Sequence, residues 1–349
     1  MNMKTIAKLA GVSVSTVSKI IHNYPDVGEE TKKHVLKIME ENGYQPSKPA
    51  KLAPIAKSQL IGVIFAGKLN VDFRHPFFIE VINAFKKQIG ILGYDVLLFS
   101  NEKFLTNGED YLARCLHHNV DGCIIIAGDE LEPSINDLDQ SDIPCIGVDI
   151  ELRGNNSAYI MSDNKKIASK VIEHFYINGY REVGYLGTDR KSGVMQTREE
   201  AFREALNNFA MPIREEWFVY SKGFEEAYGY EATKAWIAAG SLPKALFAAS
   251  DLLAFGALRA FREHRIAVPD EIAVIGCDDI EACQYITPTL TTIRQDKERI
   301  GRLAAMMLFD LMNKQTQGSS IMVEPELQIR SSCGSQPLWQ TTAPTAQSY

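Results

Sequence analysis

The chain has 349 residues, of which 45% are hydrophobic, which suits a small module joined to a two-lobed body with a sizeable core. It has no run of about 18 apolar residues, and residues 1–10 lack the apolar core of a secretory signal, so we expect a cytoplasmic protein without membrane contact. The six cysteines show no C-x-x-C spacing, which argues against a disulfide or zinc framework.

The net charge of −7 argues by itself against a nucleic-acid binder, but the charge is unevenly distributed. Residues 1–57 contain nine lysines and five acidic residues, which is 9 − 5 = +4, so residues 58–349 carry the remaining −11. A basic head that neutralises phosphates, followed by an acidic body, fits a DNA-binding protein. The alternative is an ordinary solvated helical face that is rich in lysine.

Residues 4–44 have the pattern of three short helices. Gly11 ends the first helix, Ser13 is suited to cap the second, and Gly28 is suited to cap the third. Residues 45–58 contain three prolines and three lysines with few core residues, which indicates a boundary between domains.

From Leu60 onward, short β-rich runs alternate with helical patterns. The predicted strands cover 60–65, 94–99, 122–126, 145–148, 183–186, 245–248 and 272–275. The predicted helices cover 77–92, 108–118, 164–178, 197–209, 226–239, 252–264 and 296–313. Such alternation predicts parallel sheets with helices on both faces, here in two lobes.

The segment TIAKLAGVSVSTVSKIIHN at 5–23 has the features of a helix-turn-helix. Val17, Ile20 and Ile21 point inward on its second helix, which leaves small or basic side chains on the outer face. Lys19 can donate to guanine or phosphate, and Val14 can touch a thymine methyl group. A helical hairpin without a DNA function is the alternative.

This segment, followed by Val27, Thr31, Lys32, Val35 and the GYQP run at 43–46, resembles the head of the lactose/galactose-repressor (LacI/GalR) family nearly residue for residue. The resemblance implies that Val14, Ser15 and Lys19 read the operator, and that Ser13, Thr16 and Asn23 mainly hold the backbone. The family usually has arginine at position 19, and lysine lacks the planar fork needed for bidentate reading of guanine. The predicted DNA-binding residues are Thr5, Ser13, Val14, Ser15, Thr16, Ser18, Lys19, Asn23, Ala50, Lys51 and Leu52.

The hinge departs from the family pattern. In the family, a short helix after the head places a leucine in the minor groove, whereas here Leu52 stands one place early and Pro54 shortens any such helix. Ala50 and Lys51 keep the pattern, so we favour Leu52 as a weak wedge. An extended linker whose lysines follow the phosphates is the alternative.

The resemblance continues to about residue 332 and implies a periplasmic-binding-protein-like domain. Its motifs here include HPFF at 75–78, DN at 163–164, ASD at 249–251, IGCDD at 275–279 and QD at 295–296. In open α/β folds a ligand cleft forms where strands end, and sugar hydroxyls need charged or amide partners and an aromatic surface. We therefore predict an effector site that contains Phe77, Phe78, Asp149, Arg198, Asp251 and Asp278. Asp251 and Asp278 could instead only cap helices, and only one of the two phenylalanines can face the cleft.

These observations predict a small all-α helix-turn-helix head followed by an α/β two-lobed, periplasmic-binding-protein-like ligand domain. The expected boundaries are a head at 1–46, a hinge at 47–58, an effector-binding and dimerisation domain at 59–332, and a disordered tail at 333–349. Lobe 1 is expected at about 59–161 and 294–318, and lobe 2 at about 162–291 and 320–332.

The predicted function is a transcriptional regulator, a repressor, that binds a palindromic operator as a homodimer. We expect a small effector, a sugar, to bind between the lobes and to control the affinity of the regulator for DNA. No catalytic residues, cofactor or metal are expected, since the chain has no nucleophile elbow, P-loop or G-x-G-x-x-G. The alternatives are a sugar-binding protein without DNA function, an α/β enzyme, or a family regulator that responds to a phosphorylated carrier protein or another small molecule.

Overall fold

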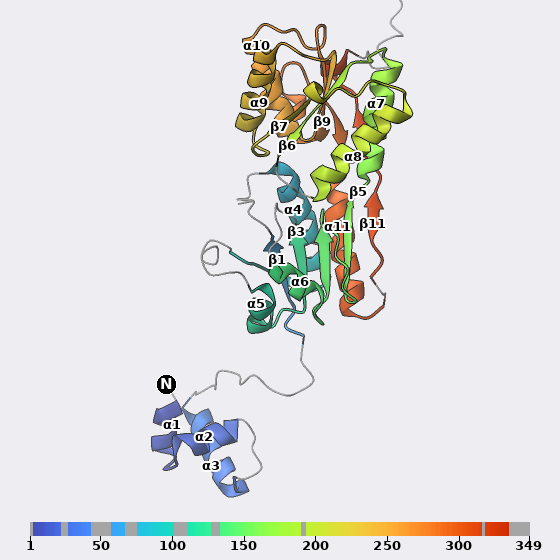
Figure 1. Ribbon diagram of the computed structural model, residues 1–349. Coiled ribbons are helices and arrows are strands. Elements are labelled where there is room, and N and C mark those ends of the chain that lie inside the picture. The colour runs from blue at the N-terminus through green and yellow to red at the C-terminus, as the bar shows by residue number, and fades with distance from the viewer. Residues whose placement is uncertain are drawn as a thin grey trace, which may run out of the picture. The chain divides into compact units, whose positions relative to one another are not determined.

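The computed structural model describes residues 3–21, 27–42, 57–66, 75–100, 110–126, 133–189, 193–315 and 318–334. The chain divides into two compact units, residues 1–57 and residues 58–349 (Figure 1). The division therefore falls between Lys57 and Ser58, inside the segment that the sequence marks as the hinge.

The first unit contains three helices, α1 (Met3–Leu9), α2 (Val14–Ile21) and α3 (Glu29–Glu41). Their apolar faces meet in one small core, and Gly11 makes the turn between α1 and α2 with a φ of +64° that favours glycine. The core residues are Ile6, Ala7, Ala10, Val17, Ile20, Val35 and Met39. This is the helix-turn-helix that the sequence predicts.

Lobe 1 of the second unit is a six-stranded parallel sheet in the order β11-β5-β4-β3-β1-β2. Its strands are β1 (Leu60–Phe65), β2 (Asp95–Leu98), β3 (Gly122–Ile126), β4 (Cys145–Val148), β5 (Ser157–Ser162) and β11 (Ile321–Val323). Helices α4 (Pro76–Ile91) and α11 (Lys297–Met312) pack on one face, and α5 (Tyr111–His118) and α6 (Pro133–Asp139) pack on the other. The strands are almost fully apolar because both faces of the sheet are covered.

Lobe 2 has a sheet in the order β12-β10-β9-β8-β6-β7, which is parallel except for β12 against β10. Its strands are β6 (Val183–Thr188), β7 (Phe218–Ser221), β8 (Ala245–Ala248), β9 (Ala273–Asp278), β10 (Thr291–Arg294) and β12 (Glu326–Gln328). Helices α7 (Asn164–Ile177) and α8 (Gly193–Asn208) cover one face, and α9 (Glu226–Ala239) and α10 (Asp251–Glu263) cover the other. Short 3₁₀ helices lie at Glu215–Trp217, Glu281–Gln284 and Ser331–Cys333.

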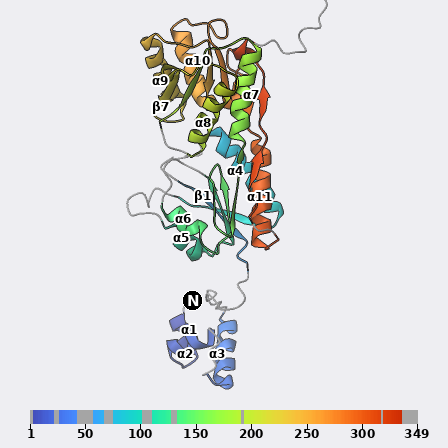
Figure 2. The same cartoon turned by 45° about the vertical axis from the view of Figure 1, so that its right-hand side comes forward.

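The chain passes between the lobes three times, from β5 to α7, from β10 to α11 and from β11 to β12. Figure 2 shows the helices of lobe 1, α4 and α11 among them, apart from α7, α8, α9 and α10 of lobe 2. The structure differs from our expected lobe limits at two points. Strand β11 extends the sheet of lobe 1, although we expected 320–332 in lobe 2. Cys333 is buried in the core of lobe 2, so the packed structure continues past the expected start of the tail. The rest of that tail, 335–349, lies outside the described residues.

Candidate effector site and DNA-reading head

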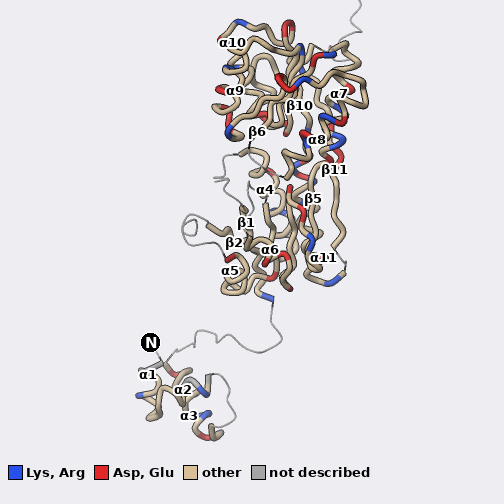
Figure 3. Tube along the Cα trace, in the orientation of Figure 1, with Lys and Arg blue, Asp and Glu red and all other residues tan. Residues whose placement is uncertain are grey.

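Helix α2 presents a polar outer face opposite its buried residues. Val17 and Ile20 are buried, whereas Ser15 and Lys19 are exposed and the Val14 side chain is 41% exposed. Lys19, together with Lys32, Lys33 and Lys37 of α3, contributes to the positive charge of the head (Figure 3). The structure thus places Val14, Ser15 and Lys19 on the surface that a duplex could reach.

The start of α2 is stabilised by hydroxyl groups. The Ser13 side-chain oxygen accepts a hydrogen bond from the backbone N–H of Thr16 at 3.0 Å, which is the predicted N-cap. The same oxygen lies 2.7 Å from the Ser15 hydroxyl and 2.8 Å from the Thr16 hydroxyl. Thr5 is exposed on α1. The remaining predicted DNA contacts lie outside the described residues or side chains: Ser18, Asn23, Ala50, Lys51 and Leu52.

Asp278 ends β9 and is the centre of the candidate effector site. Its backbone φ of +130° is rare for a residue with a side chain, and such strain persists where surrounding contacts hold it. The side chain is buried, and Gln295 donates a hydrogen bond from Nε2 to Oδ1 at 2.6 Å. Within the described part of the chain, the second carboxylate oxygen of Asp278 and Oε1 of Gln295 have no hydrogen-bond partner. Two buried acceptors therefore have no protein partner within this part of the chain, and buried polar groups in this state call for an explanation.

Arg198 on α8 is 2% exposed, and its hydrogen bonds connect α8 to the start of α7 and to the residue that follows β8. Its Nε donates to Oδ1 of Asn164 at 2.9 Å, and a terminal nitrogen donates to the carbonyl oxygen of Ala249 at 2.6 Å. Burial alone would lower the pKa of Arg198, but neighbouring groups that include Asp278 and Asp149 leave it raised. The guanidinium is thus a buried cation held by Asn164 and Ala249, and its charge interacts with the carboxylates of Asp278 and Asp149.

Asp149 follows β4 and adopts a left-handed backbone with a φ of +56°. Its N–H donates to the carbonyl oxygen of Ile160 on the neighbouring strand at 3.2 Å. Burial raises the pKa of Asp149 to about 6, and the charge on Arg198 acts in the opposite direction. Burial also raises the pKa of Asp278 to about 6, again opposed by Arg198. Both predicted carboxylates therefore belong to one electrostatic cluster around Arg198.

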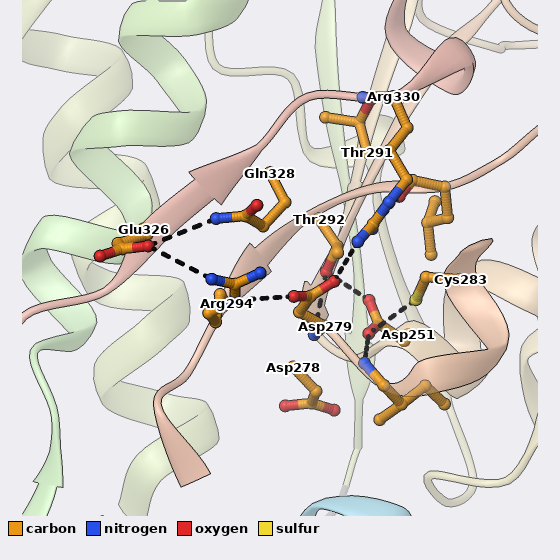
Figure 4. Close-up of polar contacts among 12 residues, drawn as sticks. Asp251, Asp278, Asp279, Cys283, Thr291, Thr292, Arg294, Glu326, Gln328 and Arg330 are labelled. Carbon is orange, nitrogen blue, oxygen red and sulfur yellow. Dashed lines mark hydrogen bonds and ion pairs between the residues drawn. The ribbon is translucent and has the colours of Figure 1, made fainter. Parts of the chain in front are cut away.

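The carboxylate of Asp251, another residue that the sequence predicts for the effector site, already has three hydrogen-bond partners within the protein. Its carboxylate accepts hydrogen bonds from the Thr292 hydroxyl at 2.5 Å, from the Ile280 N–H at 2.9 Å and from the Cys283 thiol at 3.1 Å (Figure 4). Burial and then the nearby Asp278 raise the pKa of Asp251 to about 7. Asp251 is also not the N-cap of α10, because Ser250 caps that helix. The Asp251 side chain supports the loop that follows β9.

The two phenylalanines at the start of α4 have different environments. Phe77 is buried in the core of lobe 1, whereas Phe78 is only partly buried. The ring of His75 lies 5.3 Å from the ring of Phe78 between centroids. Of the predicted pair, Phe78 therefore remains the residue that can offer an aromatic surface.

Several residues around the site were not identified from the sequence. Among the residues that the structure describes, the buried Nδ1 of His75 has no hydrogen-bond partner, and burial lowers the pKa of His75 to about 4 while Glu225 of lobe 2 opposes this shift. The Asp279 carboxylate accepts hydrogen bonds from Arg294 at 2.9 Å and from Arg330 at 2.6 Å (Figure 4). Arg330 lies 51 residues further along the chain, so no local pattern could indicate that ion pair.

Comparisons with known proteins agree with this architecture. The family model described as "Bacterial regulatory proteins, lacI family" matches residues 2–47, and that described as "Periplasmic binding protein-like domain" matches residues 172–333. The "HTH-type transcriptional repressor PurR" of Serratia proteamaculans is 31% identical over 338 residues, which cover 96% of this chain and 97% of that protein. The protein of the same name from Pasteurella multocida is 29% identical over 332 residues, covering 95% and 98%.

Solved structures show the same fold over both units. A "transcriptional regulator CelR-cellobiose complex" matches with a TM-score of 0.71 and 23% identity, covering 95% of this chain and 99% of that chain. The "lac repressor dimer bound to operator and the anti-inducer ONPF" matches with a TM-score of 0.69 and 24% identity, covering 95% and 98%. No helix within the described residues is long and apolar enough to cross a membrane. The similarity to a transcriptional repressor extends over both the helix-turn-helix head and the two-lobed body. The chain therefore belongs to the LacI family of DNA-binding bacterial transcriptional regulators.

Proposed function

We propose that this regulator is a repressor that binds a palindromic operator as a homodimer, and that a small sugar bound between its lobes changes its affinity for that operator. The observation that carries the proposal is the pair of buried, unpartnered acceptors on Asp278 and Gln295, in a protein that also has an exposed recognition face on α2. An unpaired buried acceptor costs about 1–3 kcal/mol, which a bound donor would recover.

On the DNA side, Val14, Ser15 and Lys19 are proposed to reach base edges in the major groove, because their side chains are small or flexible and lie on one exposed face. The hydroxyls of Ser13 and Thr16 sit at the helix start, where phosphate oxygens are usually bound. Thr5, Ser18 and Asn23, with Ala50, Lys51 and Leu52 of the hinge, complete the proposed contact surface.

On the effector side, the free groups favour a neutral ligand that is rich in hydrogen-bond donors. The open atoms on Asp278 and Gln295 are acceptors, and Asp149 adds a second carboxylate. The buried ammonium of Lys297, which could otherwise attract an anion, is already bound to two carbonyl oxygens and lies near a carboxylate. A polyol satisfies these acceptors, whereas a phosphate would repel them. Arg198 would donate hydrogen bonds to oxygens of the sugar, and the ring of Phe78 would pack against the apolar face of the sugar.

Two proteins of similar structure have been solved with a sugar. One is the CelR–cellobiose complex, and the other is a LacI family transcriptional regulator from Enterococcus faecium "with bound ribose". A sugar in the corresponding place of this chain agrees with the acceptor-rich site. Asp251 is proposed to act behind the site by holding the Asp278 loop, rather than by contacting the sugar.

A thermal-shift screen of the purified protein tests this proposal, because a ligand that binds only the folded chain raises its melting temperature. The panel contains neutral mono- and disaccharides, their phosphates, and nucleobases. We expect a neutral sugar to raise the melting temperature of the wild type but not of Asp278→Ala. If only a phosphate or a nucleobase stabilised the protein, the proposal of a sugar effector would be overturned, whereas the proposed role as a repressor would be unaffected.

A further inference from the structure

Lys297, the first residue of α11, is a buried lysine that contacts both lobes. Its side chain is 7% exposed. The ammonium donates hydrogen bonds to the carbonyl oxygens of Asp278 at 2.8 Å and Asp279 at 2.7 Å, and it lies 3.6 Å from Oε2 of Glu80. Buried lysines are rare and are usually paired, and Lys297 has two hydrogen bonds and one ion pair.

The two groups of partners belong to different lobes. Asp278 and Asp279 form the end of β9 in the sheet of lobe 2, where both residues have positive φ angles, +130° and +52°. Glu80 lies on α4, whose buried face is part of the core of lobe 1. Burial raises the pKa of Glu80, and the Lys297 ammonium opposes that shift. A single ammonium therefore joins the effector-facing strand end to a helix of the other lobe.

The helix that carries Lys297 is firmly attached to lobe 1. One turn after Lys297, a Cβ on Gly301 would lie 2.2 Å from the carbonyl oxygen of Val81 and 2.8 Å from the backbone nitrogen of Phe85. Only glycine permits so close an approach of two backbones, and α4 and α11 lie side by side in both views (Figures 1 and 2). Lys297 and Glu80 therefore move together as parts of lobe 1, and the ammonium reaches from lobe 1 to the end of β9.

We propose that Lys297 is a positioning residue that couples the Asp278 end of β9 in lobe 2 to α4 in lobe 1. Lys297 already binds the backbone carbonyl of Asp278. A ligand that donates a hydrogen bond to the second carboxylate oxygen of Asp278 would therefore act on the same residue. Binding of the ligand and the position of one lobe relative to the other would then change together. Its role in control of DNA binding depends on the proposed function. The coupling itself requires no ligand.

Hydrogen–deuterium exchange on the unliganded, full-length protein tests the coupling. The backbone N–H groups of Asp279 and Ile280 report on the strand end, because both are hydrogen-bonded to side chains of lobe 2. We expect Lys297→Met to speed their exchange roughly tenfold or more, since a charge-assisted contact is lost. Glu80→Gln, a change in the other lobe, should speed the same amides about threefold. The matched control is Arg302→Met, which removes a positive charge from an exposed position of the same helix.

The double variant separates coupling from local support. If Glu80 acts through Lys297, Glu80→Gln adds no further acceleration to Lys297→Met. Unchanged exchange in Glu80→Gln would overturn the proposal, because Lys297 would then only hold its own loop. Glu80 is about half-exposed, so its variant decides the matter even if Lys297→Met does not fold. Failure of every sugar to bind would count against the proposed function and would leave this measurement unaffected.

Discussion

At the scale of single residues, the candidate site depends on a few side chains whose burial or backbone conformation is energetically unfavourable. Asp278 combines a strained backbone, a buried carboxylate and an oxygen that has no partner in the described part of the protein. Such a combination persists only where the surroundings supply enough support, here from Lys297 on its carbonyl and Gln295 on its side chain. The polar groups that offer most to a ligand are therefore those that contribute least to the stability of the empty protein.

The raised pKa of Asp278 predicts a specific dependence of stability on pH. Its pKa is about 6 in the folded chain against an ordinary value of 3.8, so between these values the folded chain binds the proton more tightly than the unfolded chain does. The stabilising contribution is fully present below about pH 4 and is lost as the pH rises through about 6. Asp278→Asn removes this loss, so the variant should gain up to about 3 kcal/mol relative to the wild type between pH 4 and pH 7.

Urea unfolding of both proteins at four pH values between 4 and 7 measures this difference. Asp270→Asn, at an exposed position of the same lobe, serves as the control. A free-energy difference between Asp278→Asn and the wild type that stays constant with pH would show that the Asp278 carboxylate titrates in its ordinary range.

At the scale of elements, helix α2 has one buried face and one exposed face. Its buried residues pack against α1 and α3, and at its start the hydroxyl of Ser13 contacts those of Ser15 and Thr16. The roles of single side chains on this face can be separated by the way each responds to sequence and to salt.

Lys19→Ala distinguishes base reading from phosphate binding. If Lys19 reads a base, operator affinity should fall by about 1–3 kcal/mol and discrimination at one base pair should relax. If it meets only phosphate, affinity should fall equally on all duplexes and the salt slope should flatten by about one. Binding titrations at several salt concentrations provide the measurement, with Lys37→Ala on α3 as a control for charge. Wild-type affinity in Lys19→Ala would remove this residue from the interface.

The hinge carries a second prediction at this scale. If Leu52 acts as a minor-groove wedge, affinity should depend on the central base step of the operator, with flexible pyrimidine–purine steps preferred. Leu52→Ala should then lose most affinity on those duplexes. Binding of both proteins to duplexes that differ only at the central step measures the effect. Equal losses on every duplex would leave the hinge as a linker that acts through its lysines.

At the scale of the whole molecule, the helix-turn-helix and the candidate effector site belong to different units of the chain. The second unit has both sheets, all three passages between the lobes and the candidate effector site, whereas the first has the exposed recognition face. Each unit has a core of its own, so the functions should separate when the chain is cut between them.

A protein that begins at Ser58 should therefore keep the thermal shift of the full chain with a sugar, because the site lies wholly in the second unit. It should lose operator binding entirely, within the range of an electrophoretic shift assay, because it lacks α2. Tight binding of the same duplex by this shortened protein would show that the head is not the part that reads DNA.

The sequence by itself determined the class of the fold and most of its elements. Periodicity located the strand at 122–126 and the helix at 226–239 with the limits that the structure shows, because strongly apolar runs and helical spacing are local properties. It missed β5, β7, β10 and the short β11 and β12, whose brief or polar runs become strands only by pairing with a neighbour. The family resemblance supplied the head and the order of the site residues.

Only the tertiary structure decided which protein groups these side chains bind. Asp251 and Asp278 both follow or end a buried strand, yet Asp251 accepts hydrogen bonds from Thr292, Ile280 and Cys283, whereas one oxygen of Asp278 has no partner among the described residues. The roles of Asp279 and Lys297 depend on partners that lie 51 and 217 positions away, Arg330 and Glu80. Hydrogen bonds and ion pairs form between neighbours in space, so residue type and local spacing predict that a polar side chain is needed, but the fold decides what it binds.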